Sequence, residues 1–140
     1  MGPEAVRPLR LRVLRPGGVP ADAVWPGDDA PGAAHLAVCE AGAAVAIASV
    51  LPEPHPVAPA PGDWRLRGMA TAPERRGAGL GAALVGACIA HVRASGGRRL
   101  WCHARVGALA LYERAGFAAE TGAFDVPGIG PHVRMALPLA

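Results

Sequence analysis

The stretch TAPERRGAGLGAALVGA, residues 71–87, joins two arginines to three glycines at alternate positions, and a run rich in Ala, Leu, Val and Ile follows. The apolar run predicts a helix over residues 80–95, closed by the glycine pair at 96–97. The preceding segment WRLRGMAT, residues 64–71, has the composition of a strand. Bare backbone and positive charge therefore coincide where a strand passes into a helix, which indicates a ligand site.

The charge and the glycines of this loop suit a phosphate-bearing ligand. A helix N-terminus offers unpaired N–H groups and the positive end of the helix dipole, and a diphosphate is a natural ligand there. Side chains at Gly77, Gly79 and Gly81 would hold phosphate oxygens away from those N–H groups. Arg75 and Arg76 add charge-assisted contacts. The alternative is a flexible turn with a solvated surface, which the loop by itself does not exclude.

Two well-known nucleotide motifs fit the loop less well. GAGLGA, residues 77–82, satisfies the dinucleotide pattern G-x-G-x-x-G/A, but APERR separates it from the strand, and RRLWCHA, residues 98–104, contains no acid. The remaining chain is too short for a second mononucleotide-binding half. The absence of Gly-Lys-Ser/Thr excludes a Walker A loop. A nicotinamide-dependent oxidoreductase is thus a distant alternative.

Residues 76–81, RGAGLG, fit Q/R-x-x-G-x-G/A, and with this motif the chain resembles the GNAT superfamily of N-acetyltransferases, small bacterial type. The resemblance is densest from Trp64 to Ala118, where LRGMATAPERRGAGLGAAL, LWCHAR and ALYERAGF follow in order. The tail FDVPGIGPHVRM resembles one subgroup of small bacterial members. The resemblance implies an α/β fold: a mixed, mostly antiparallel sheet with splayed central strands, flanked by two main helices, with reduced N-terminal helices.

The remaining segments supply further elements of this fold. RPLRLRVLRPG, residues 7–17, alternates leucine and valine with arginine and predicts a first strand with one wet face. Ala41-Gly42 predicts a hairpin turn, and the Pro-rich residues 52–63 predict a connector without regular structure. Further predicted elements are a strand over 98–104, a helix over 106–117 with Gly116 as its C′ residue, and strands over 117–121 and 132–139. One domain, residues 1–140, accounts for the chain.

The resemblance also implies a site. The backbone of Met69, Ala70 and Thr71 would bind the pantetheine arm of acetyl-CoA, and one N–H there would polarise the thioester carbonyl. Tyr112 would protonate the departing thiolate, because a phenol is protonated at neutral pH. The implied cofactor-binding set is Met69, Ala70, Thr71, Arg75, Arg76, Gly77, Ala78, Gly79, Leu80, Gly81 and His103. His103 stands where many relatives carry an Asn that contacts the cofactor, so this contact is open.

The general base stays unassigned. The candidates on the acceptor side are Asp28, Asp29, His35, Asp125 and His132, and a water relay is equally compatible. His91 suits the C-terminal end of its helix and is interpreted as structural. Cys39, Cys88 and Cys102 show no metal-ligand spacing and are interpreted as core residues.

The amino-acid composition limits the classes of partner that we expect the protein to bind. The 140 residues carry a net charge of +3, and apolar residues make up 51%. Scattered arginines and few aromatic residues argue against nucleic acid, and no segment suits a signal peptide, a membrane span or a metal site. We therefore expect a cytoplasmic enzyme that moves an acetyl group from acetyl-CoA to a primary amine of a small molecule or peptide in a ternary complex, and a homodimer stays open. The alternative is a non-catalytic domain that binds or senses acyl-CoA.

Overall fold

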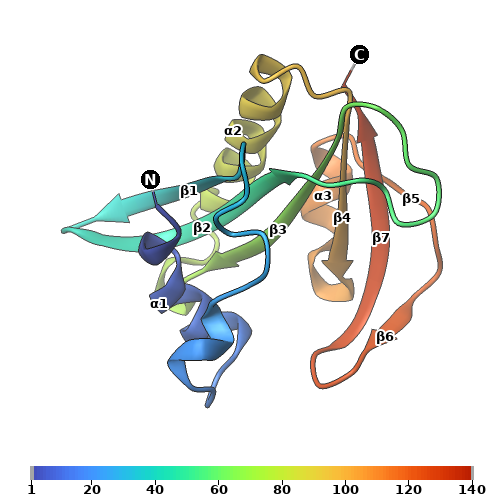
Figure 1. Cartoon of the computed structure of the whole chain (residues 1–140). Helices are drawn as coiled ribbons and strands as arrows, with labels where there is room; N and C mark the ends of the chain where they lie inside the picture. Colours follow the sequence, from blue (N-terminus) through green and yellow to red (C-terminus); the bar gives the residue numbers. More distant parts are fainter. Residues whose placement is uncertain (1, 140) are drawn as a thin grey trace.

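A computed structural model describes residues 2–139, which form a mixed sheet with helices on both faces (Figure 1). The strands are β1 (Ala34–Glu40), β2 (Ala43–Pro52), β3 (Asp63–Thr71), β4 (Arg99–Arg105), β5 (Ala118–Ala119), β6 (Phe124–Val126) and β7 (Gly130–Pro138). The α-helices are α1 (Arg7–Leu9), α2 (Leu80–Ala94) and α3 (Leu109–Arg114), and further helical segments are η1 (Pro3–Ala5), η2 (Arg10–Leu14), η3 (Pro20–Ala23), η4 (Pro73–Arg75) and η5 (Val106–Ala108).

The strand order is β1-β2-β3-β4-β7-β5, with β6 paired to β7. Only β3 and β4 run parallel, and the other neighbours are antiparallel. The predicted mixed, mostly antiparallel sheet is therefore confirmed. The hairpin turn between β1 and β2 falls at Ala41-Gly42, as predicted, with φ of 50° and 80°.

The predicted first strand over residues 7–17 is wrong. Residues 7–14 are helical, and the chain enters the sheet only at β1. Val6, Leu9 and Val13 follow the i, i+3, i+7 spacing of a helix face and pack against Ile47 on the sheet. The leucines of this segment also alternate with a period of two, as in a strand. The segment is nevertheless helical, because the helical conformation buries these apolar residues on one side. The N-terminal helices are short, as the resemblance implied.

Helices α2 and α3 cover the opposite face of the sheet. The buried side of α2 faces β1, β2 and β3 and consists of Leu84, Val85, Cys88, Ile89 and Val92. Its other side is exposed and carries the small residues Ala82, Ala83, Gly86, Ala87 and Ala90.

Both helices end in the same hydrogen-bonded motif. After α3, Phe117 N–H donates to the Tyr112 carbonyl and Gly116 N–H to the Glu113 carbonyl, each at 3.0 Å. Gly116 has φ of +105°. This is the Schellman end predicted from the sequence.

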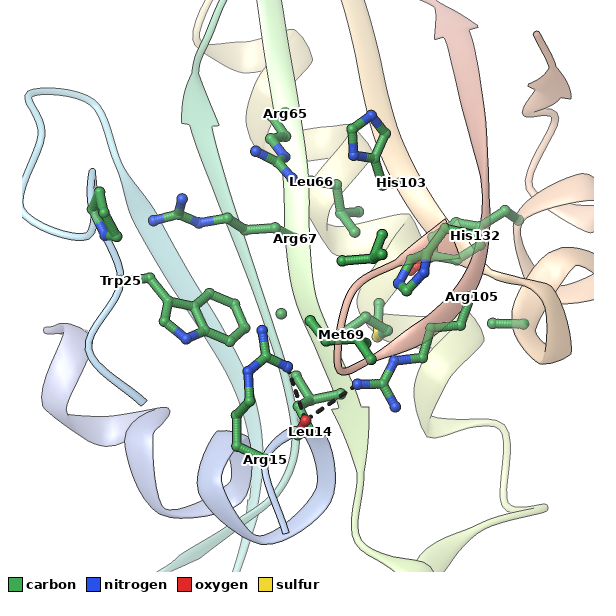
Figure 2. A pocket seen from close by; sticks show the side chains of 16 residues that line it. Leu14, Arg15, Trp25, Arg65, Leu66, Arg67, Met69, His103, Arg105 and His132 are labelled. Atoms are coloured by element: carbon green, nitrogen blue, oxygen red, sulfur yellow. Dashed lines mark hydrogen bonds between the residues drawn. The ribbon is translucent and has the colours of Figure 1, made fainter. Parts of the chain in front are cut away.

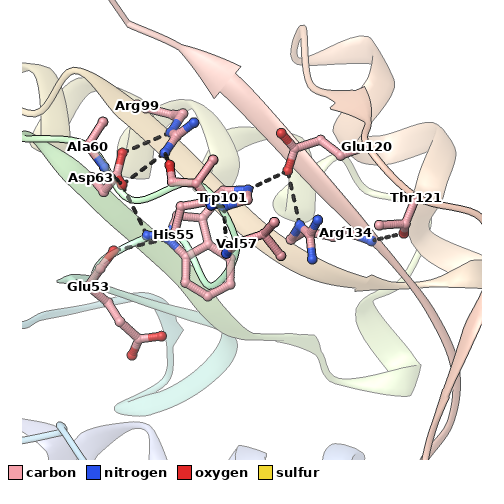
Figure 3. A network of polar contacts seen from close by, with 11 residues as sticks. Glu53, His55, Val57, Ala60, Asp63, Arg99, Trp101, Glu120, Thr121 and Arg134 are labelled. Atoms are coloured by element: carbon pink, nitrogen blue, oxygen red, sulfur yellow. Dashed lines mark hydrogen bonds and ion pairs between the residues drawn. The ribbon is translucent and has the colours of Figure 1, made fainter.

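The Pro-rich connector between β2 and β3 is irregular, as predicted, yet it is fixed to the sheet (Figure 3). Asp63 accepts the N–H groups of His55 and Ala60 at 3.0 and 2.8 Å and pairs with Arg99 at 2.8 Å. Burial alone would raise the pKa of Asp63, but these contacts lower it to about 2. Residues at both ends of the connector are thereby held against β4.

The three cysteines lie in two different environments, buried and exposed. Cys88 and Cys102 lie in the core, where burial raises the pKa of each thiol to about 12, so both are inert hydrophobic residues. Cys39 is exposed near the end of edge strand β1, so its interpretation as a core residue is wrong. In the part of the chain that the structure describes, no helix has the length and apolar character needed to cross a membrane.

Candidate active site

The glycine loop follows β3 and leads directly into α2. Gly77 and Gly79 have φ of +81° and +79°, which L residues rarely adopt, and a Cβ at either would meet nothing within 4 Å. The backbone conformation itself therefore demands glycine here, a reason that sequence reasoning did not supply. Gly81 differs, because its backbone is helical and a Cβ there would lie 3.4 Å from Leu111 of α3.

The N-terminus of α2 is open for an anionic ligand. The first bond of the helix runs from Ala83 N–H to the Gly79 carbonyl at 3.1 Å. The N–H groups of Leu80, Gly81 and Ala82 therefore precede the helix ladder. Residues 76–79, including Ala78, are exposed around them. These features fit a diphosphate.

The two arginines of the loop differ. Arg75 makes a bidentate ion pair with Glu40 of β1, with both nitrogen–oxygen distances at 2.7 Å. Hydrogen bonding to Glu40 raises the pKa of Arg75. Arg76 is exposed. Arg76 is thus the better placed of the two to meet a phosphate, and Arg75 would first have to leave Glu40.

Strands β3 and β4 separate after a short paired segment. The parallel register runs from Asp63–Arg99 to Arg65–Trp101 and then stops, although β3 continues to Thr71 and β4 to Arg105. The splayed central strands implied by the resemblance are present. In the seam that opens between them, the facing edges of the two strands are not paired with each other.

A bulge in β3 lies beside this seam. Ile47 of β2 pairs with Ala70 and Ser49 pairs with Arg67, so Gly68 and Met69 together oppose one residue of β2. Gly68 has φ of +66°. The extra residue turns Met69 toward the helix face, where it packs against the core cluster. The predicted backbone triad Met69, Ala70 and Thr71 thus begins at the bulge and borders the seam.

A cavity of about 370 Å³ opens where the strands part, and its walls combine residues from the helix face with residues from the opposite face (Figure 2). Tyr112, Met69 and Leu66 come from the helix side. The other wall contains Trp25 and His132. The complete lining is Leu14, Arg15, Trp25, Pro26, Arg65, Leu66, Arg67, Gly68, Met69, His103, Arg105, Ala108, Tyr112, Val126, Ile129 and His132.

Tyr112 lies on α3, is 4% exposed and contacts this cavity. Its ring packs edge-on against Phe117 with centroids 5.5 Å apart, so the Schellman end fixes the tyrosine. Burial raises the pKa of the phenol well above its usual range. The hydroxyl therefore stays protonated and can donate a hydrogen bond throughout the physiological pH range.

His103 also lines the cavity, on the face opposite α2 and α3. It lies between Trp101 and Phe124, with ring centroids at 5.3 and 5.2 Å. Burial, and then the charge of Arg65, lower the pKa of His103 to about 4. The imidazole is therefore neutral at pH 7 and can donate or accept one hydrogen bond.

Of the candidate bases only His132 lines the cavity. Asp29 and Asp125 are exposed elsewhere. His35 is buried, where Nε2–H donates to the Asp28 carbonyl at 2.9 Å and Nδ1 lies 2.7 Å from Ser49 Oγ. Asp28 is held in a buried ion pair. His132 is 7% exposed, and its Nδ1–H donates to the Gly130 carbonyl at 2.8 Å, so in the neutral ring Nε2 holds the lone pair.

Sequence reasoning missed most of the charged wall. Arg65 and Arg67 share a strand face, and the alternation of WRLRGM was a usable signal for that. Arg15 and Trp25 come from irregular segments, which carry no periodicity. Nothing in residues 2–139 brings three His, Cys, Asp or Glu side chains together as a metal site. His91, interpreted as structural, packs edge-on against Trp64 at 6.1 Å.

Known proteins share both the sequence pattern and the fold. The family model described as "Acetyltransferase (GNAT) family" matches residues 10–117. The uncharacterized N-acetyltransferase YitI of Bacillus subtilis (strain 168) is 34% identical over 127 residues, covering 91% of this chain and 85% of that protein.

Solved structures of known proteins have a similar fold. A candidate N-acetyltransferase from Lactobacillus plantarum superposes with a TM-score of 0.80 at 20% identity, covering 99% of this chain and 91% of that one. An aminoglycoside 6'-N-acetyltransferase solved with coenzyme A gives a TM-score of 0.70 at 15% identity, covering 99% and 91%. The chain belongs to the GNAT family of acetyltransferases.

Proposed function

We propose that this protein transfers an acetyl group from acetyl-CoA to a primary amine by direct attack in a ternary complex. One observation carries the proposal: β3, whose pairing with β4 stops at Arg65, lines a cavity together with Tyr112 and His132 and is followed by the glycine loop and α2. A donor bound along the seam would thus bring its reactive end to the two groups that can move protons.

We assign the diphosphate and the pantetheine arm of acetyl-CoA to two different parts of the chain. The N–H groups of Leu80 and Gly81 and the guanidinium of Arg76 would hold the diphosphate. The peptide groups of Met69, Ala70 and Thr71 would hold the pantetheine arm, with His103 as a further contact from the facing strand. When bound, acetyl-CoA supplies an acetyl thioester to the cavity.

Tyr112 and His132 would then divide the proton transfers. In the reaction a C–N bond forms and the C–S bond of the thioester breaks. His132 Nε2 would accept the proton that the amine loses, because Nδ1–H is already engaged with the Gly130 carbonyl. The Tyr112 hydroxyl would give a proton to the leaving sulfur, and a backbone N–H at the β3 bulge would stabilise the developing oxyanion.

A thiol-release assay tests the proposal. Acetyl-CoA is incubated with polyamines, amino acids, aminoglycosides and peptide N-termini, and free CoA is measured with a thiol reagent. We expect amine-dependent release that falls in Tyr112→Phe. Tight acetyl-CoA binding without release for any amine would instead favour a non-catalytic acyl-CoA sensor. A parallel titration with NADPH should give no binding.

A further inference from the structure

The cavity wall has one sign of charge. Four arginines contribute to it, and none of the described lining residues is an aspartate or glutamate: the four are Arg15, Arg65, Arg67 and Arg105. They come from the N-terminal segment, β3 and β4, and their side chains meet around the cavity in Figure 2. A site of this kind attracts anions and repels cations.

Two of these arginines form ion pairs with acidic residues that do not line the cavity. Arg67 pairs with Asp28 at 3.0 Å, and Arg65 pairs with Glu53 at 3.1 Å. Their Nε atoms are buried and make no hydrogen bond within the described chain. These two side chains are therefore held in place, and much of their charge is compensated.

Arg15 and Arg105 are different, because both guanidiniums donate to one neutral oxygen. The Leu14 carbonyl accepts Arg15 at 2.8 Å and Arg105 at 3.3 Å, which brings two positive charges together at the cavity (Figure 2). Burial, followed by the charge of Arg105, lowers the pKa of Arg15, and the field of Asp22 opposes this only in part. Two adjacent guanidiniums that share a carbonyl are under-compensated, and an anion between them would relieve their repulsion.

We infer that the acceptor is an amine that also carries an anionic group, a carboxylate or a phosphate, and that Arg15 and Arg105 bind this group. The inference rests on the proposed function. Arg105 is the register partner of His132 across β4 and β7, so the anion would be held next to the residue that accepts the proton of the amine. A polycationic amine would be disfavoured by the same wall.

Matched acceptors test the inference in the thiol-release assay. Glycine is compared with glycinamide, alanyl-alanine with its C-terminal amide, and phosphoethanolamine with ethanolamine, with spermidine as a polycation. We expect the anionic member of at least one pair to have a kcat/KM about 10- to 100-fold higher, the usual weight of hydrogen bonds to a charged group. The pair that responds distinguishes carboxylate from phosphate. Equal rates within every pair, or preference for spermidine, would overturn the inference.

Two variants, Arg105→Met and Arg15→Met, test whether these arginines bind the anionic group of the acceptor. Each should raise the KM for the anionic amine about 10- to 100-fold and leave the affinity for CoA, measured by calorimetry, unchanged. Arg93→Met, which removes an equal charge from the exposed side of α2, is the matched control and should do neither. A loss of CoA affinity in Arg105→Met with an unchanged acceptor KM would assign the arginine pair to the cofactor and refute the inference.

A binding measurement keeps the two proposals separable if no amine is acetylated. Glycine and phosphoethanolamine are titrated calorimetrically into the CoA-loaded protein and into CoA-loaded Arg105→Met. Binding that the variant loses would support the anion site although acetyl transfer had failed. Absence of binding to the unsubstituted protein would overturn the anion site.

Discussion

Arg10 and Asp28 form a bidentate ion pair inside the protein, with distances of 2.7 and 3.0 Å and side chains that are 0% and 2% exposed. The same carboxylate accepts the Trp25 N–H at 3.0 Å and pairs with Arg67. The Arg10 guanidinium also lies 4.0 Å from the centroid of the Trp25 ring. One buried pair therefore holds the N-terminal helical segment, a loop and two residues of the cavity wall in their relative positions.

Asp28→Asn should strongly destabilise the fold. The change leaves Arg10 buried without its counter-charge, and breaking a buried pair in this way costs about 3–5 kcal/mol. Urea unfolding at pH 7 measures the loss. Glu74→Gln is the matched control, because it removes a carboxylate from an equally short but exposed pair with Arg12 and should change stability little. Similar losses in both variants would contradict the importance of burial.

The stability gap between the unsubstituted protein and Asp28→Asn should depend on pH. Burial alone would raise the pKa of Asp28, but hydrogen bonds from Arg10, Trp25 N–H and Arg67 lower it to about 2. A group whose pKa is depressed by folding stabilises the protein above its unfolded pKa and loses that contribution as pH falls toward the folded one. The gap should therefore be full above about pH 4 and narrow between about pH 4 and 2. Unfolding curves across this range check it, and a constant gap would be the contrary result.

Gly79→Asp should abolish acetyl-CoA binding, and Gly79→Asn should weaken it much less. Asn and Asp both tolerate the left-handed conformation of this position, so the two variants bear similar backbone strain. They differ in the charge that they place where the diphosphate would lie. Calorimetric titration with acetyl-CoA, with thermal unfolding as the folding check, compares them. Equal affinities would remove the loop from the cofactor site.

Arg76→Ala should raise the KM for acetyl-CoA and leave kcat nearly unchanged, because a phosphate contact acts on the ground and transition states alike. Arg75→Ala should have a smaller effect, since Arg75 is already paired with Glu40. Arg93→Ala, near the far end of α2, is the control. Steady-state kinetics with varied acetyl-CoA provides the measurement, and equal effects at all three positions would point to long-range electrostatics.

Tyr112→Phe should lower kcat by roughly 10²-fold while acetyl-CoA affinity and stability hold. The ring remains, so its packing on Phe117 is kept. Because burial raises the pKa of Tyr112 far above its usual range, the tyrosine should not produce an alkaline limb in the accessible pH–rate profile. Kinetics from pH 6 to 10 test both points. A lower melting temperature with intact turnover would identify Tyr112 as a packing residue.

His132→Gln should lower kcat, since a glutamine cannot accept the proton of the amine. The side chain can still donate a hydrogen bond toward the Gly130 carbonyl, so the β6–β7 turn should survive. His91→Gln, on α2 and away from the cavity, should leave kcat unchanged. An unaltered kcat in His132→Gln would leave water as the proton acceptor.

Most regular elements from β1 onward could be predicted because their signals are local, whereas β6 lies in a segment for which no strand was predicted. The Ala41-Gly42 turn, the Gly116 helix end and the glycine loop each depend on conformations that few residues adopt. Residues 7–17 were mispredicted because Leu9, Leu11 and Val13 alternate like a strand, whereas the helical segment that forms buries its apolar face on the sheet and Arg10 against Asp28. Asp28 lies 18 positions away in an irregular segment, where no periodic pattern predicts its pairing with Arg10.

The same difference between local and distant information applies to the site. The glycine loop is continuous in sequence, so the loop and the residues that border the seam could be singled out from the sequence, and its phosphate ligand stays a prediction. The charged wall of the cavity is assembled from Arg15, Trp25, Arg65 and Arg105, which meet only after the sheet has formed. His132 was one of five open candidates, and the carbonyl that fixes its tautomer is visible only in the structure.

The parting of β3 and β4 gives the sheet two edges in its interior. Unpaired edges ordinarily invite strands of other chains and promote aggregation. Here α2 and α3 cover one side, and the other side is lined by arginines that repel one another and basic chains alike. A narrow molecule with its own amide groups can hydrogen-bond to the peptide groups at these two edges, whereas a neighbouring protein cannot approach them freely. Hydrogen exchange at alternate amides of residues 69–71 and 102–105 should therefore slow when acetyl-CoA binds, since the donor would complete the sheet as its missing strand.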